Sequence, residues 1–159
     1  MKTYIFDSNV IIDLKKFNTT VFKSLWNNIY SMVDNDTIFS VSEVQREISK
    51  IDDSVNKKWK NIHNDCGFFV DLSEKDNAIE YWEAMGELES FETFQRHGEN
   101  KSLWADPYLI AIGMVDDSIV VTNERMTSNP ESKIPFVCEQ IGVKCLNFDE
   151  FMIHRSWQW

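Results

Sequence analysis

The stretch YIFDSNV occupies residues 4–10, and its first three residues decide how the fold begins. A short, continuous apolar run that ends at a charged residue is typical of a strand buried in a parallel sheet. The stretch SIVVTNE at residues 118–124 shows the same pattern near the other end of the chain. Both predicted strands therefore lead directly into acidic or amide side chains.

Further strands are expected over residues 37–40, 68–70 and 143–146, with helices in the intervals between strands. Apolar residues at helical spacing predict these helices over 10–14, 21–33, 42–51, 53–66, 74–97, 106–115, 136–141 and from 148 onward. The segment 74–97 is expected to be one long acidic helix or a helical hairpin, and Ser42 is expected to cap its helix. Strands that alternate with helices predict an α/β fold, in three layers, whose mostly parallel sheet has four to five strands.

The composition sets limits on the function. The 159 residues fit a single domain spanning 1–159. The net charge is −10, which argues against a broad basic surface that grips nucleic acid. Most of this charge lies in residues 61–99, which hold ten acidic and two basic residues. The remaining segments, which are close to neutral, leave room for contact with a polyanion only in a local groove.

Several other classes of protein are disfavoured. The three cysteines, Cys66, Cys138 and Cys145, form no C-x-x-C pair, which fits a reducing compartment and gives no zinc signature. The histidines His63, His97 and His154 also lack metal-ligand spacing. No apolar run approaches the roughly 20 residues that span a membrane, and Asp7 comes too early for a signal peptide. A cytoplasmic protein without membrane association is expected.

Four carboxylates from distant segments are predicted to meet. Asp7 ends the first strand, and Glu124 follows the strand over 119–122. Asp106 begins the helix that leads into that strand, and Glu47 lies one turn into the helix after the second strand. In open α/β sheets these places share the carboxyl edge, where ligands bind.

Packed carboxylates raise one another's pKa values and destabilise a fold unless a cation balances them. Oxygen ligands favour Mg²⁺ or Mn²⁺, and one or two such ions would assist hydrolysis of a phosphodiester. Glu43 is a reserve candidate, because a helical wheel places Glu47 beside the apolar stripe and Glu43 further toward solvent. Each acid also has a purely structural interpretation: Asp106 before Pro107 would suit a helix N-cap, and residues 122–124 could form an ordinary loop.

Four short motifs, taken in their order along the chain, resemble those of PIN-domain ribonucleases, a family that includes VapC-type toxins of toxin–antitoxin systems. The resemblance rests on the following blocks: Asp7-Ser8-Asn9 like the opening D-[ST]-N motif, Ser42 and Glu47 at the spacing of the second block, Ala105-Asp106 with Ala111 like the A-D-x-x-I-A block, and Val121-Thr122-Asn123-Glu124 like the closing V-T-x-D block. Together they cover the chain from about Ile5 to Leu146.

The resemblance implies a set of roles. The catalytic and metal-binding acids would be Asp7, Glu47, Asp106 and Glu124. Asn9 and Thr122 would orient them, with help from Ser8 and Asn123. It also implies an RNA substrate, a cognate antitoxin protein and a homodimer. Two departures stand out: Glu124 occupies a position where Asp is commoner, and extra length falls at about 53–66 and 86–101.

Two alternatives stay open. A HAD-like phosphatase also begins with a strand and an Asp, but it normally carries a second Asp two residues later, where this chain has Asn9. A PIN-like fold could also serve as a catalytically inactive binding module. The acidic segment 74–99 is either an ordinary solvated helix face or a docking surface for a basic partner. The aromatic residues of 148–159 either pack on the core or mark an interface.

Overall fold

The computed structural model describes residues 2–62, 67–95, 104–125 and 133–157. Its centre is a five-stranded parallel sheet with the strand order β3-β2-β1-β4-β5. The strands are β1 (Tyr4–Phe6), β2 (Ile38–Val41), β3 (Phe69–Val70), β4 (Ile119–Val121) and β5 (Cys145–Leu146). Tyr4 pairs with Ile38 on one side and with Ile119 on the other, so β1 is the central strand.

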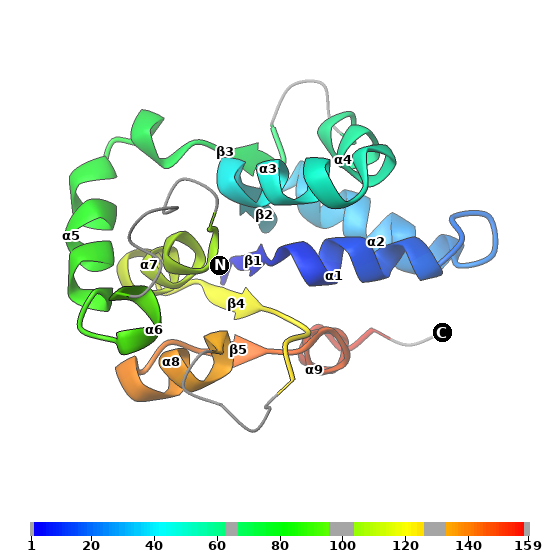
Figure 1. Cartoon of the computed structure of the whole chain (residues 1–159). Coiled ribbons are helices and arrows are strands. Elements are labelled where there is room, and N and C mark those ends of the chain that lie inside the picture. Colours follow the sequence, from blue (N-terminus) through cyan, green and yellow to red (C-terminus); the bar gives the residue numbers. More distant parts are fainter. Residues whose placement is uncertain (1, 63–66, 96–103, 126–132, 158–159) are drawn as a thin grey trace.

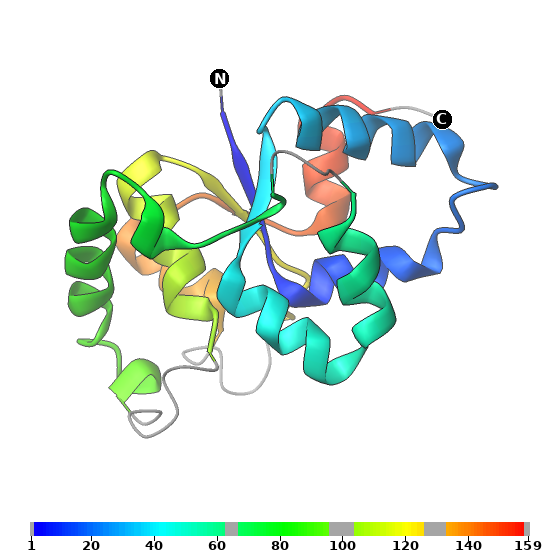
Figure 2. The same cartoon turned by 90° about the horizontal axis from the view of Figure 1, so that it is seen from above.

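Helices cover both faces of the sheet. They are α1 (Ser8–Asp13), α2 (Lys23–Asp34), α3 (Ser42–Ile51), α4 (Asp53–Lys60), α5 (Ala78–Leu88), α6 (Glu92–Gln95), α7 (Asp106–Asp116), α8 (Ile134–Ile141) and α9 (Phe148–His154), with 3-10 turns η1 (Leu14–Lys16) and η2 (Leu72–Glu74). Helices α5 and α7 lie on one side of the sheet, and α2 and α9 lie on the other (Figures 1 and 2). The predicted fold class is confirmed: the chain is α/β, with the three-layer arrangement of a PIN-like fold.

The details differ from expectation in a few places. Of the two forms expected for the acidic segment, a single long helix is wrong, because a turn at Glu89–Phe91 separates α5 from the short α6 and the helix begins only at Ala78. Ser42 is the first residue of α3 and not its cap, since Val41 holds the N-cap position without a side-chain hydrogen bond. Of the expected extra length, α4 fills 53–60, while 63–66 and 96–101 lie outside the described residues.

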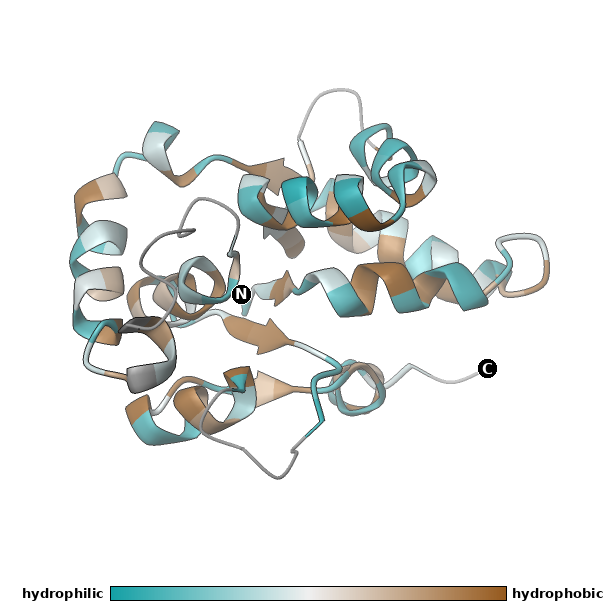
Figure 3. Cartoon of the chain, viewed as in Figure 1, coloured by the Kyte–Doolittle hydropathy of each residue, from teal (hydrophilic) through white to brown (hydrophobic). Residues whose placement is uncertain are grey.

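The core explains the apolar runs. All three residues of β1 and of β4 are buried, and β4 is hydrophobic throughout (Figure 3). Phe148 and Phe151 of α9 join this core against Phe6, which favours the packing interpretation of the C-terminal aromatics. Within the described part of the chain, no helix is long and apolar enough to cross a membrane.

Two helical glycines allow a matched stability prediction. A Cβ at Gly113 in α7 would stand 2.5 Å from Val143 Cγ1, whereas a Cβ at Gly86 in α5 would meet nothing within 4 Å. We expect Gly113→Ala to lower the free energy of unfolding by about 1–3 kcal/mol through overpacking. Gly86→Ala should raise it by about 0.5–1 kcal/mol, because alanine is the better helix former. Urea denaturation of both variants checks this pair, and equal effects of the same sign would contradict it.

Candidate functional site

The site lies where the strand order reverses direction. Chain order runs outward from β1 to β2 and β3 on one side, and from β4 to β5 on the other. Such switch points open a crevice at the carboxyl ends of the strands. Asp7 follows β1 and Thr122 follows β4, and their side chains meet there, with Thr122 Oγ1 donating to Asp7 Oδ2 at 2.8 Å.

Asp7 is buried and tightly held. Its Oδ1 accepts a hydrogen bond from the Ser8 backbone amide at 2.6 Å, and through this bond Asp7 caps the N-terminus of α1. Its Oδ2 accepts from Asn9 Nδ2 at 2.6 Å as well as from Thr122. Burial is the main cause that raises the pKa of Asp7 to about 6, and the nearby charges of Glu124 and Glu47 add to it.

Glu47 reaches the same place from α3. Its Oε1 accepts a hydrogen bond from the Ala105 backbone amide at 2.9 Å, immediately before Asp106. The Ser8 hydroxyl donates a hydrogen bond to Asp7 Oδ1 at 3.3 Å, and it also lowers the pKa of Glu47. Ser8 therefore sits between two of the acids. Burial raises the pKa of Glu47, and Glu124 contributes in the same direction.

Asp106 is the first residue of α7, and Ala105 holds the N-cap position, so the N-cap interpretation of Asp106 is wrong. Burial raises the pKa of Asp106 well above its usual value, and the charges of Asp7, Glu124 and Glu47 raise it further. The Trp104 side chain donates a hydrogen bond to Asp106, which acts in the opposite direction.

Glu124 has a structural partner that accounts for its length. Its Oε2 accepts a hydrogen bond from the backbone amide of Ile134, the first residue of α8, at 2.7 Å. Lys133 Nζ lies 3.8 Å from Glu124 Oε1. The backbone amide of Glu124 donates a hydrogen bond to Thr122 Oγ1 at 3.1 Å. An Asp side chain is one methylene shorter, so the Glu is what lets this carboxylate span from β4 to α8.

The electrostatics place all four acids in one neighbourhood. Asp106 is affected by the charge of each of the other three, although they come from α3, β1 and β4. Among the described residues, no three His, Cys, Asp or Glu side chains stand close enough together to hold a metal ion as they are. The donors are hard carboxylate oxygens that repel one another, so the chemistry of the set fits Mg²⁺ or Mn²⁺. Binding would have to draw the side chains inward.

Glu43 does not lie where the helical wheel placed it. The residue is 7% exposed, more buried than Glu47, because α3 packs against β2 and β3 of the sheet. Its charged neighbours are Arg46, with Nη1 3.4 Å from Oε1, and Asp71. Oε2 is buried without a hydrogen-bond partner, and burial raises the pKa of the carboxyl group. The expectation that Glu43 faces solvent is therefore wrong.

Asn9 and Asn123 connect the acids to the surrounding helices. Asn9 Oδ1 accepts from the Asn123 backbone amide at 2.8 Å. Asn123 Nδ2 donates to Asp13 in α1 at 2.9 Å, and its Oδ1 accepts from the Phe148 amide of α9 at 3.0 Å. Asp13, Trp104 and Lys133 were missed by the sequence reasoning. Their contacts are set by tertiary packing, so no motif or spacing could have signalled them.

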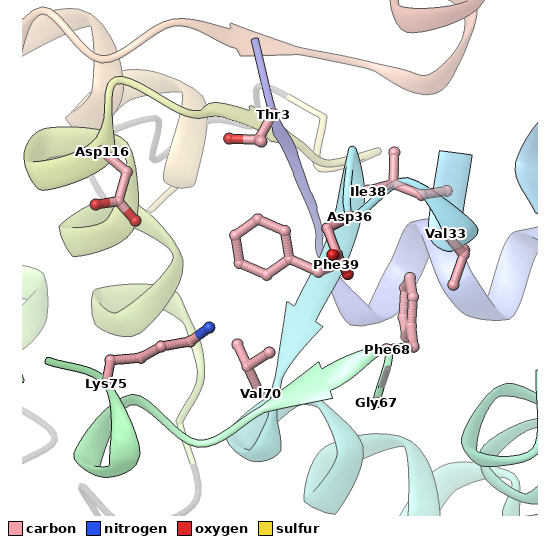
Figure 4. Close-up of a pocket in the computed structure, with 10 residues that line it drawn as sticks. All are labelled: Thr3, Val33, Asp36, Ile38, Phe39, Gly67, Phe68, Val70, Lys75 and Asp116. Atoms are coloured by element: carbon pink, nitrogen blue, oxygen red, sulfur yellow. The ribbon is translucent and has the colours of Figure 1, made fainter. Parts of the chain in front are cut away.

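Cavities lie at both edges of the sheet. One of about 350 Å³ extends from Asn123 and Glu124 to Lys16 and Arg125, and Glu124 is the member of the four acids that lines it. Another of about 480 Å³ lies at the opposite, amino edge of the strands (Figure 4). The residues that line it carry charges of both signs and include none of the predicted site residues: Thr3, Val33, Asp36, Ile38, Phe39, Gly67, Phe68, Val70, Lys75 and Asp116.

The two oxygens of Glu124 allow its structural and chemical roles to be separated. Glu124→Gln keeps an oxygen that accepts from Ile134 but loses the charge, so stability should change by less than about 0.5 kcal/mol. Glu124→Asp keeps the charge but loses contact with α8, which should cost about 1 kcal/mol. Thermal denaturation of the metal-free variants checks the order. If Gln proves the more destabilising change, the contact with α8 is not what Glu124 supplies.

A comparison with known protein families gives a match over nearly the whole chain. The model of a family described as a domain of unknown function, DUF4411, matches residues 4–159. No curated protein and no solved structure matches the chain.

Proposed function

We propose that this chain, which belongs to the DUF4411 family, is a Mg²⁺- or Mn²⁺-dependent endoribonuclease that hydrolyses RNA phosphodiester bonds. The observation that carries the proposal is the convergence of Asp7, Glu47, Asp106 and Glu124. Three of these carboxyl groups have raised pKa values, and the charges of the neighbouring acids contribute to each shift. A fold keeps such mutual repulsion where function requires it, and a divalent cation relieves it.

The surrounding residues support this chemistry. Asn9 and Thr122 hold Asp7 Oδ2, and the Ala105 amide holds Glu47, so two of the acids have fixed orientations. A bound divalent cation would activate a water molecule and stabilise charge on the phosphate. The cavity that Glu124 lines also contains Arg125, which we assign to a neighbouring phosphate of the substrate.

The choice of RNA, and the partners, rest on the four motifs. Their resemblance to VapC-type toxins supports a cognate antitoxin protein that neutralises the enzyme, a homodimeric state and a cytoplasmic location. Growth arrest on expression, relieved by co-expression of a small neighbouring gene, would support the toxin role. Normal growth would count against it and would leave the nuclease proposal to be judged by cleavage.

Cleavage by the purified full chain tests the function. We expect internal cleavage of single-stranded RNA with MgCl₂ or MnCl₂, none with EDTA, and none by Asp7→Asn or Asp106→Asn. Activity that persists in both variants would show that the site is wrong. A phosphoenzyme on Asp7 would instead favour the HAD-like phosphatase, and RNA binding without cleavage would favour the inactive binding module.

A further inference from the structure

The outer surface of α5 carries two parallel rows of exposed side chains. Ile79 and Trp82 are 73% and 49% exposed, and with Gly86 they follow the i, i+3, i+7 spacing of one helix face. The neighbouring face carries exposed Glu80, Glu83 and Glu87 at the equivalent spacing. The opposite side of α5 packs on α7. An apolar row therefore lies beside an acidic row on the outside of the protein.

A cavity of about 210 Å³ deepens the apolar row. It lies between α5, α6 and the start of α7, and Trp82, Gly86, Phe94, Trp104 and Tyr108 contribute to its walls. The rings are held by edge-to-face contacts: Trp82 lies 6.0 Å from Tyr108, and Phe94 lies 4.9 Å from Trp104, centroid to centroid. This preformed, mostly aromatic hollow would accept a large apolar side chain.

Gly86 leaves the helix surface beside the cavity open. Glycine inside a helix costs about 0.5–1 kcal/mol relative to alanine. Nothing in the described structure requires it, since a Cβ at this position would meet no atom within 4 Å. Gly86 is also one of the residues that line the cavity. A glycine here is useful when another chain packs closely against the backbone.

We propose that α5 and this cavity, which we call the α5 face, bind an amphipathic helix of a partner protein that carries a basic row. Its apolar anchors would occupy the row of Ile79, Trp82 and Gly86, with one large side chain in the cavity. Its Lys or Arg side chains would lie against Glu80, Glu83 and Glu87. The acidic row disfavours a polyanion, so the same surface does not suit RNA. This inference is independent of the nuclease proposal.

Fluorescence anisotropy with a synthetic peptide tests the α5 face. The probe is a labelled helix of about 20 residues, roughly 30 Å long, with leucines at i, i+3, i+4 and i+7 and arginines along one flank. We expect it to bind the full chain. Trp82→Ala and Gly86→Leu should each weaken binding at least about tenfold, and Gly86→Leu should leave the fold intact because leucine is a good helix former.

The role of the acidic row in peptide binding is tested with a matched pair of variants. Glu83→Gln should weaken binding a few-fold and reduce its dependence on salt, whereas Glu139→Gln, an exposed acid on α8, should change neither. The proposal is overturned if the peptide fails to bind at about 100 μM, or if a peptide with Glu in place of Arg binds equally well. The proposal is also overturned if Gly86→Leu leaves the affinity for the peptide unchanged. It is overturned as well if single-stranded RNA binds to the protein and loses affinity in both the Trp82→Ala and Gly86→Leu variants.

Discussion

Asp106→Asn should abolish metal-dependent RNA cleavage while making the metal-free protein more stable. The substitution removes a charge that burial and three neighbouring acids disfavour, and the remaining amide oxygen can still accept from Trp104. We expect cleavage to fall at least about 10²–10³-fold, as for loss of a group that acts on the transition state. Thermal unfolding and single-turnover cleavage on the same preparations measure both effects.

The opposite signs distinguish this outcome from simple damage to the fold. A structural aspartate would lose stability and activity together when replaced. Asp7→Asn should gain less stability than Asp106→Asn, because the Asp7 carboxylate accepts from Ser8, Asn9 and Thr122, and an amide group cannot accept from all of them. Glu80→Gln, on the outside of α5, is the control and should change neither property. A destabilised Asp106→Asn protein would contradict the prediction.

The second large effect is a loss of stability as the pH rises. The pKa of Asp7 is about 6 in the folded protein and close to its ordinary value of 3.8 when unfolded. The folded state therefore binds this proton more tightly, and stability declines as the pH rises from about 4 to 6. Asp7 alone accounts for about 3 kcal/mol of this decline in metal-free protein. Asp106 and Glu47, whose pKa values are also raised, act in the same direction.

Other carboxylates have lowered pKa values, and they determine how stability falls at low pH. These residues are Asp13, Asp52, Asp53 and Asp71. Hydrogen bonds to neighbouring groups lower their pKa values, so their contribution to the stability of the fold is present above about pH 4 and is lost below it. The metal-free protein should therefore be most stable near pH 4–5. Urea denaturation in EDTA from pH 3.5 to 7.5 measures the profile, and Asp106→Asn should flatten its upper side. Stability that rises from pH 5 to 7 would refute the electrostatic account.

Much of the architecture was predictable from the sequence because its strands are short apolar runs that end at polar residues. The run at 4–6 forms β1 with the predicted bounds, and its neighbour at 118–122 forms β4. Parallel pairing of these two strands then brings Asp7 beside Thr122. That juxtaposition follows from local pattern and topology, both of which a single sequence carries.

The orientation of individual side chains was less predictable. The helical wheel for α3 assumed that the core lies on one side of the helix, yet Glu43 is buried as well where α3 packs on the sheet. The hydrogen bond from the Ile134 amide of α8 to Glu124 joins positions ten residues apart, and no periodicity signals it. Such contacts depend on how finished elements pack, and local sequence does not specify that packing.

Titration with Mn²⁺ tests the central claim most directly, because it requires neither an RNA nor a partner. Isothermal calorimetry on the full chain at pH 7 should show binding that Mg²⁺ competes for, with release of protons from the carboxyl groups whose pKa values are raised. Asp106→Asn should lose that binding, and Glu80→Gln should keep it. Failure of Mn²⁺ to bind the parent protein at millimolar concentration, or equal binding by Asp106→Asn, would contradict a metal site built from these four carboxylates.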